Sequence, residues 1–264
     1  MGKMCARDGG SVEGRGMSGV AVLMACRNRR KTTMRCLECL MSQLDGKSGI
    51  FLLDDGSTDG TGDAVRKAFP QVSVIDGDGS LYWASGMRKA WEIAISGCQN
   101  WDGYIWLNDD TELRADAVER LFSVGDGEKI VVGELENSAG EIVYGLREGG
   151  FFTGNCVLVP SKAYKRLGMI CGDYSHAWAD YDYAAQAKRA GIGVVSAGVV
   201  GKAEWHPNRP GLMGMSLKQR LLLLRDPKGW NLHDLWLYRR RNWGIAAAVV
   251  SCMHLVLHVI LGER

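Results

Sequence analysis

Two pairs of adjacent acids stand out in this sequence, each at the end of an apolar run. The first pair is Asp54 and Asp55, and the second is Asp109 and Asp110. Adjacent carboxylates repel each other unless water or a suitable partner surrounds them. A divalent cation is such a partner, because Mg²⁺ prefers oxygen ligands, and so are the hydroxyl and base donors of a nucleotide. Each pair could instead cap the next helix, but the presence of both pairs favours a shared ligand cleft.

The pattern around these acids predicts the elements that position them. Short apolar runs predict buried strands at 19–26, 49–55, 71–77 and 102–110. Helical spacing follows at 27–44, 56–69 and 85–97. Thr58 or Asp59 is the predicted N-cap of the second helix. This alternation predicts a parallel, doubly wound α/β sheet, whose ligands bind beyond the carboxyl ends of the strands. All four acids are therefore expected at one edge of the sheet.

Composition excludes several classes of protein. The chain has 264 residues, 46% hydrophobic and 23% charged, which suits a globular domain with a sizeable core. A net charge of +2 argues against a nucleic-acid binder. Cys36 and Cys39 lack a second Cys or His pair, so a zinc site is disfavoured and core thiols in a reducing cytosol are expected.

Five stretches occur in the order and spacing of a known family. They are VAVLMACRNRRKT, LLDDGSTDGT, GDGSLYWASGMRKAWEIA, YIWLNDDTEL and HAWADYDYAAQAKRAG. Over residues 19–210 the chain resembles family 2 glycosyltransferases of the GT-A fold, and most of all the bacterial rhamnosyltransferase-like branch that builds surface polysaccharides. The resemblance implies a Rossmann-like nucleotide-diphospho-sugar transferase domain at 19–210. Residues 1–18 are expected to be a disordered leader, with no secretory signal, and 211–264 a helical extension.

The resemblance also implies which residues hold the donor. The base of a nucleotide would lie among Ala25, Arg27, Asp54 and Asp55, with either acid in contact with it. In the donor-side loop, Gly86 would let the backbone approach the nucleotide sugar, and Arg88 would face a phosphate. Trp83 would either contact the donor or belong to the core.

Residues 108–110 match the metal motif of the family. Asp110 would ligate Mg²⁺ or Mn²⁺ directly, and Asp109 would face the ribose or the metal shell. Asn108 stands in place of an acid. The cation would bridge the diphosphate to the protein. His206, placed after the last core strand, would complete the metal shell, although a structural role for a lone histidine remains an alternative.

The resemblance places the catalytic base at Asp180. Inverting transfer needs a base that takes the proton of the acceptor hydroxyl. Asp180 occupies the position of that base at a helix start, with Ala179 where the family often has Glu. Asp182 is the second candidate. The alternative for Asp180 is an acid that only stabilises a helix N-terminus.

The C-terminal segment differs from the rest of the chain. Residues 243–261 carry no formal charge and just reach the length that spans a bilayer. They follow three arginines at 239–241. Three interpretations compete: a helix lying on a membrane, a helix packed on the domain or on a second copy, and a true span. His254 and His258 share a helix face but lack further metal ligands.

Together these features predict an inverting, metal-dependent glycosyltransferase. It would move rhamnose or another hexose from a UDP- or dTDP-linked donor to a hydroxyl of a bacterial surface glycan or lipid-linked oligosaccharide. We expect it in the cytoplasm, at the cytoplasmic face of the inner membrane, with homo-oligomerisation left open. A nucleotidyltransferase is a rival, although no glycine-rich loop follows the first strand. A non-catalytic sugar-nucleotide-binding subunit is another, suggested by Ala179.

Overall fold

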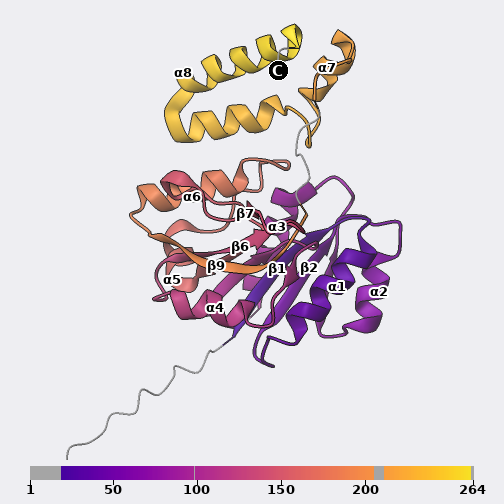
Figure 1. Cartoon of the computed structure of the whole chain (residues 1–264), viewed down its shortest axis with the longest axis vertical. Coiled ribbons are helices and arrows are strands. Elements are labelled where there is room, and N and C mark those ends of the chain that lie inside the picture. Colours follow the sequence, from indigo (N-terminus) through magenta and orange to yellow (C-terminus); the bar gives the residue numbers. More distant parts are fainter. Residues whose placement is uncertain (1–18, 98, 205–210, 263–264) are drawn as a thin grey trace, which may run out of the picture.

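The computed structural model describes residues 19–97, 99–204 and 211–262. A mixed sheet crosses the centre of the molecule, and helices cover both of its faces (Figure 1). The strands are β1 (Val20–Cys26), β2 (Gly49–Asp54), β3 (Val72–Asp76), β4 (Gly103–Leu107), β5 (Glu112–Leu113), β6 (Ile130–Glu136), β7 (Ile142–Tyr144), β8 (Cys156–Pro160) and β9 (Val194–Lys202). The helices are α1 (Arg30–Met41), α2 (Thr61–Ala68), α3 (Tyr82–Ser96), α4 (Ala117–Val124), α5 (Ser161–Leu167), α6 (Ala179–Arg189), α7 (Leu217–Leu223) and α8 (Leu232–Leu261), with a short 3-10 turn η1 (Glu148–Gly150).

The predicted α/β class is confirmed, and the first four strands are parallel as expected. Their order is β3-β2-β1-β4, and the sheet continues as β8-β6-β9-β5 with β7 paired to β6. β1 and β4 are almost entirely buried, which suits their β-branched and aromatic composition. The carboxyl ends of β1, β2 and β4 therefore meet at one edge, as the alternating pattern predicts.

The second half of the sheet is not purely parallel, which the sequence pattern did not predict. β8 runs antiparallel to both β4 and β6, whereas β6 and β9 are parallel. β8 starts where β4 ends, because Leu107 pairs with Cys156 and the N–H of Asn108 donates to the carbonyl of Asn155 at 2.9 Å. This reversal brings the loop before β8 to the ligand edge of the sheet.

Two layers of helices enclose the sheet. Helices α3, α5 and α6 pack on one face around an aromatic core that includes Trp91, Trp106 and Tyr183. Helices α1, α2 and α4 cover the other face with mainly aliphatic contacts. The six cysteines in the described ranges are free, and Cys26, Cys36 and Cys156 are buried.

The predicted N-cap of α2 is wrong. Gly60, with φ of 77°, precedes the first helical residue, so neither Thr58 nor Asp59 occupies the cap. The carboxylate of Asp59 instead accepts a 3.0 Å hydrogen bond from the N–H of Thr61 in a local turn. The N–H of Thr58 donates to the side-chain oxygen of Asn28 at 2.7 Å. The bond between Thr58 and Asn28 ties the 54–60 loop to the loop after β1.

The C-terminal helix α8 is broken at Gly244, where φ is 86° and ψ is 177°. It consists of a first limb, residues 232–243, and a second limb, residues 245–261, which folds back above the first (Figure 1). By length and composition α8 is long and apolar enough to cross a membrane. Only 11% of its apolar stretch of 18 residues is buried. Gly244 gives the helix a bend that periodicity alone does not predict.

Candidate active site

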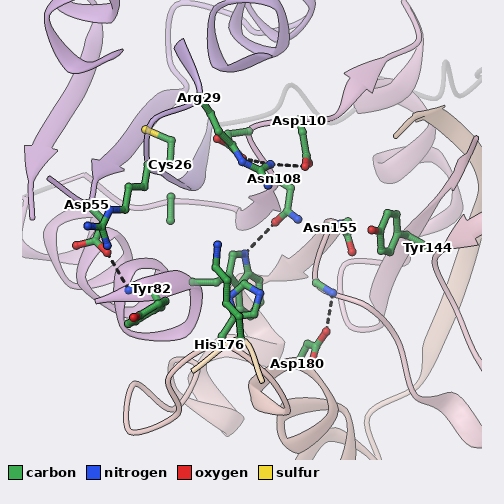
Figure 2. A pocket seen from close by; sticks show the side chains of 16 residues that line it. Cys26, Arg29, Asp55, Tyr82, Asn108, Asp110, Tyr144, Asn155, His176 and Asp180 are labelled. Atoms are coloured by element: carbon green, nitrogen blue, oxygen red, sulfur yellow. Dashed lines mark hydrogen bonds and ion pairs between the residues drawn. The ribbon is translucent and has the colours of Figure 1, made fainter. Parts of the chain in front are cut away.

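A cavity of about 220 Å³ opens at the carboxyl ends of the parallel strands. It is lined by residues of β1, α3, β7 and α6, by the loops that follow β2 and β4, and by further loops from the second half of the chain (Figure 2). Eight of the residues singled out from the sequence line it: Ala25, Arg27, Asp55, Trp83, Asn108, Asp109, Asp110 and Asp180.

The first acid pair is held by backbone amides. Asp55 lines the cavity, and its carboxylate accepts hydrogen bonds from the N–H groups of Gly79 and Tyr82, both at 2.9 Å. Asp54 does not line the cavity, and its carboxylate accepts from the N–H of Ser57 at 3.0 Å. Asp55 is therefore the member of the pair that is placed to meet a ligand, and Asp54 shapes the turn that follows β2.

Arg29 binds both acids of the second pair. Its guanidinium pairs with Asp109 at 3.4 Å and, more closely, with Asp110. Asp109 is only 5% exposed, and burial raises its pKa to about 7, although Arg29 opposes this. The hydroxyl of Thr33 also donates to Asp109 at 3.3 Å. In Asp110, Oδ1 is buried and has no hydrogen-bond partner among the described residues.

The middle of the cavity is set by Trp83 and Asn108. The indole N–H of Trp83 donates to the side-chain oxygen of Asn108 at 2.9 Å (Figure 2). The Trp83 ring also packs edge-on against Trp106, with ring centroids 6.3 Å apart. Trp83 thus belongs to the core on one side and to the cavity on the other, and it fixes the orientation of the Asn108 amide.

Asp180 lies in the first turn of α6, on the side of the cavity away from Asp110 (Figure 2). Its carboxylate accepts hydrogen bonds from the N–H of Gly154 at 3.0 Å and from its neighbour Tyr181 at 2.8 Å. Burial nevertheless raises the pKa of Asp180 from 3.8 to about 6. A carboxylate with this pKa can take up a proton near neutral pH and release it again.

The second candidate base, Asp182, is fully buried and points away from the cavity. Its carboxylate accepts from Arg241 Nε at 3.0 Å and from Asn242 Nδ2 at 2.8 Å, both in α8. The side chain of Gln186 adds a third bond at 2.9 Å. Asp182 therefore joins α6 to the first limb of α8 and is not placed to meet a substrate.

Two other predicted residues, both in α3, do not line the cavity. At Gly86 a Cβ atom would lie 2.7 Å from the side chain of Leu53, so the glycine serves the packing of α3 on the sheet. Arg88 pairs with Glu92 at 2.7 Å within α3. His206 lies outside the described residues, as does the predicted leader.

Eight further residues line the cavity without having been predicted as site residues: Cys26, Arg29, Tyr82, Tyr144, Gly154, Asn155, His176 and Lys228. Arg29 belongs to the basic run after β1, a signal that the sequence did offer. Tyr144 and Lys228 reach the cavity only through the fold, because β7 and the α7–α8 loop are distant in the chain. Burial and nearby Lys228 lower the pKa of His176 to about 4, so its ring is neutral at pH 7.

Backbone strain gathers around this cavity. In the described part of the chain, the residues other than glycine with positive φ are Asn28, Tyr82 and Trp178. Tyr82 lines the cavity, and each of the other two lies within two residues of a lining residue. Such conformations cost free energy and tend to be retained where function requires them. The strain independently marks the same site.

The chain matches a family model and several solved structures. The model described as glycosyl transferase family 2 matches residues 21–153, just over half of the chain. Among curated protein sequences, none matches this chain significantly. A mannosyltransferase from Pyrobaculum calidifontis, PcManGT, solved with GDP-Man and Mn²⁺, is similar with a TM-score of 0.57 at 14% identity, over 94% of this chain and 76% of that one.

Two further structures have the same fold. TarS residues 1–349 from S. aureus gives a TM-score of 0.57 at 11% identity, over 93% of this chain and 90% of that one. Glucosyl-3-phosphoglycerate synthase from Mycobacterium tuberculosis, solved with Mg²⁺ and UDP, gives 0.51 at 16% identity, over 73% of each chain. At these identities the likeness concerns the fold. Taken with the family match, it shows that this chain has the GT-A fold and belongs to glycosyl transferase family 2.

Proposed function

We propose that this protein transfers a sugar from a nucleoside diphosphate donor to an acceptor hydroxyl, with inversion at the anomeric carbon. One observation carries the proposal: Asp110 and Asp180 line the same cavity from different sides, each with a carboxylate suited to a different task. Asp110 has an unpartnered buried oxygen, and Asp180 has a raised pKa. Membership of glycosyl transferase family 2 supports glycosyl transfer itself.

The residues around Asp110 fit a divalent cation. Asp110 Oδ1 lacks a partner among the described residues, and carboxylate oxygens are the ligands that Mg²⁺ and Mn²⁺ favour. Those residues include no group of three or more His, Cys, Asp or Glu side chains that could hold a metal, so diphosphate and water would supply the other ligands. Asp110 would ligate the ion directly, with Asp109 beside it and His206 as a further ligand. When bound, the ion would neutralise charge on the departing diphosphate.

The donor would occupy the part of the cavity lined by Ala25, Arg27 and Asp55. The base would meet Asp55, whose carboxylate is already oriented by backbone amides. Arg29 and Lys228 would approach the diphosphate, since both are cations that line the cavity. Solved relatives carry GDP-Man with Mn²⁺ or UDP with Mg²⁺, which supports a nucleotide sugar with a divalent ion; we infer a UDP- or dTDP-linked hexose, such as rhamnose.

Asp180 would act as the base. As the acceptor oxygen bonds to the anomeric carbon, its proton passes to the Asp180 carboxylate, and the bond to the diphosphate oxygen breaks with its electron pair. Attack from the face opposite the leaving group inverts the configuration. The amides of Gly154 and Tyr181 hold the carboxylate in place. Ala179 is buried in the core, so the absent Glu leaves no gap in the cavity lining.

The acceptor would be a hydroxyl of a bacterial surface glycan or lipid-linked oligosaccharide, reached at the cytoplasmic face of the inner membrane. We assign the reaction to residues 19–210, with the helical extension 211–264 contributing Lys228 to the cavity. A nucleotidyltransferase is disfavoured by the family match. A non-catalytic binding subunit is disfavoured by Asp180, because a purely binding site needs no carboxyl group of raised pKa opposite the cation site.

A donor screen tests the proposal. The full chain is incubated with UDP-, dTDP- and GDP-sugars, Mg²⁺ or Mn²⁺, and a lipid-linked glycan extract, and products are identified by mass spectrometry. We expect a glycosylated product and free nucleoside diphosphate, both abolished by chelation. Asp110→Ala should lower turnover at least about a thousandfold, since the ion stabilises leaving-group charge. Asp63→Ala, at an exposed acid of α2, is the control. Absence of a glycosylated product with every donor, or unchanged turnover in Asp110→Ala, would contradict the proposal.

A further inference from the structure

The second limb of α8 carries a continuous apolar face. Ile245, Val249, Met253 and Leu257 follow one another at intervals of four residues, so they lie along one side of the helix. All of them are exposed, as is Ile260 beside them. The opposite side of the same limb, with Ala248 and Val259, is buried. We call this exposed set of the second limb the apolar face.

The structure shows what holds this face outward. Arg220 in α7 donates to the carbonyl of Ile260 at 3.2 Å, and the ring of Trp230 lies 4.9 Å from that of His258. These contacts fix the end of the second limb beside α7. The buried side of the limb is already occupied, so the apolar face has no partner among the described residues. Exposed apolar surfaces of this kind mark binding sites for proteins or membranes.

The C-terminal segment that carries the apolar face is also basic. Residues 211–262 contain seven Lys or Arg and two acids, and one of these acids, Asp234, is fully buried. This segment therefore carries a net charge of +5, whereas residues 1–210 carry −3. Lys218, Arg225 and Arg240 are exposed and form no ion pair within the described ranges. The combination of an apolar stripe with unpaired cations is complementary to an anionic lipid surface.

The bend at Gly244 argues against a membrane span. The second limb has 17 residues, so it is about 26 Å long at the usual helical rise, which is shorter than a hydrocarbon core of about 30 Å. Its far end lies beside Arg220 and Trp230, next to the start of the first limb. A limb that crossed a bilayer would carry that end away from α7. The first limb is held to the domain by Asp234, which accepts from the N–H of Ser175 at 3.1 Å.

We propose that the apolar face of the second limb of α8 binds an anionic bilayer, lying in its surface without crossing it. The apolar side chains enter the boundary between headgroups and acyl chains, while the surrounding Lys and Arg meet the phosphates. The same extension reaches the cavity, because Lys228 lines it and Asp234 holds the His176 loop. Membrane binding would therefore anchor the extension that supplies Lys228 to the cavity. This proposal is independent of the transfer reaction.

Vesicle sedimentation of the full chain tests the proposal. We expect strong binding to vesicles of phosphatidylcholine and phosphatidylglycerol in equal parts. Binding to phosphatidylcholine alone should be at least about tenfold weaker, since each cation near an anionic surface contributes about fivefold. Binding to the mixed vesicles should also fall as salt is raised. Failure of the unmodified chain to bind either vesicle overturns the proposal, whatever its transferase activity.

Paired charge substitutions locate the binding surface. Met253→Glu with Leu257→Glu, at side chains 59% and 51% exposed, should weaken vesicle binding at least about tenfold. Ile93→Glu with Val124→Glu is the matched control, because these residues are 42% and 45% exposed on the domain itself. Circular dichroism verifies that both variants keep their helices. Equal binding by both double variants would contradict the assigned face.

Light scattering separates a lipid surface from a second copy of the chain. We expect the unmodified protein and the double variant with Met253→Glu and Leu257→Glu to have the same mass in solution. If it is instead a dimer that these changes dissociate, and the dimer does not bind vesicles, then a second copy covers the apolar face and the proposal is wrong.

Discussion

The backbone N–H of Gly154 donates a 3.0 Å hydrogen bond to Oδ2 of Asp180. This bond joins the loop before β8 to the first turn of α6, and it aims the carboxylate at the cavity. The two residues lie 26 positions apart, in separate elements. The position of the proposed base is thus set by a long-range contact.

Asp180→Asn should abolish the proposed base while leaving the donor site intact. The amide keeps the size of the side chain but cannot accept the proton, so turnover should fall about a hundredfold to ten-thousandfold. The affinity for the nucleotide, measured by calorimetry with Mg²⁺ or Mn²⁺, should change less than about threefold, since Asp180 lies away from Asp110. Near-normal turnover would show that a group other than Asp180 acts as the base.

The rate should depend on pH through the raised pKa of Asp180, which is about 6. Below that pH the carboxyl is protonated, so kcat/KM should fall about tenfold per pH unit. For stability the sign is opposite: a raised pKa favours the protonated folded state, so its contribution is full below 3.8 and is lost as the pH rises through about 6. In Asp180→Asn the residual rate and the free energy of unfolding should both lose this dependence. If the variant kept the same fall in rate at acid pH, a group other than Asp180 would be responsible for it.

Gly154→Ala should disturb the cavity through Trp83. A Cβ atom at this position would lie 2.6 Å from Cζ2 of the indole, so the ring or the loop must move. We expect a loss of about 1–3 kcal/mol in the free energy of unfolding, together with lower turnover. Gly97→Ala is the matched control, because its added Cβ meets nothing within 4 Å. If both variants were equally stable, the Trp83 ring would be able to move aside without any loss in the free energy of unfolding.

Arg241→Ala should destabilise the contact between α6 and α8. The change leaves the fully buried carboxylate of Asp182 without its cation, which costs about 3 kcal/mol for a buried pair and less where water reaches it. Arg240→Ala, its exposed neighbour, should stay within about 0.5 kcal/mol of the unmodified chain. Denaturant unfolding measures both. If the two variants behaved alike, Asp182 would not depend on Arg241.

Lys228→Ala should weaken donor binding with little effect on the chemical step. Lys228 lines the cavity from the α7–α8 loop and would approach the diphosphate. We expect the KM for the donor to rise about tenfold, since charge-assisted contacts to phosphate are among the stronger hydrogen bonds. Lys218→Ala, at an exposed cation of α7 that does not line the cavity, should leave KM unchanged. A matching rise in both variants would indicate a general effect of charge.

Local patterns predicted the first half of the fold well. The apolar runs that end in Asp54, Asp55, Asp109 and Asp110 correspond to β2 and β4, and the structure places both ends at one edge of the sheet. Alternating strands and helices are encoded by neighbouring residues, and parallel strands joined by helices bring like ends together. The acids could therefore be grouped without knowledge of any long-range contact.

The remaining features depend on contacts between distant segments. The antiparallel entry of β8 brings Gly154 beside Asp180, and the packing of the extension against the domain brings Lys228 to the cavity. Asp55 rather than Asp54 faces the cavity because the backbone amides of Gly79 and Tyr82 donate hydrogen bonds to its carboxylate. Periodicity reports which face of an element is apolar, but the packing of whole elements decides which side chains meet. That is why the sequence alone located the edge of the sheet, whereas the tertiary structure selected the residues that face one another across the cavity.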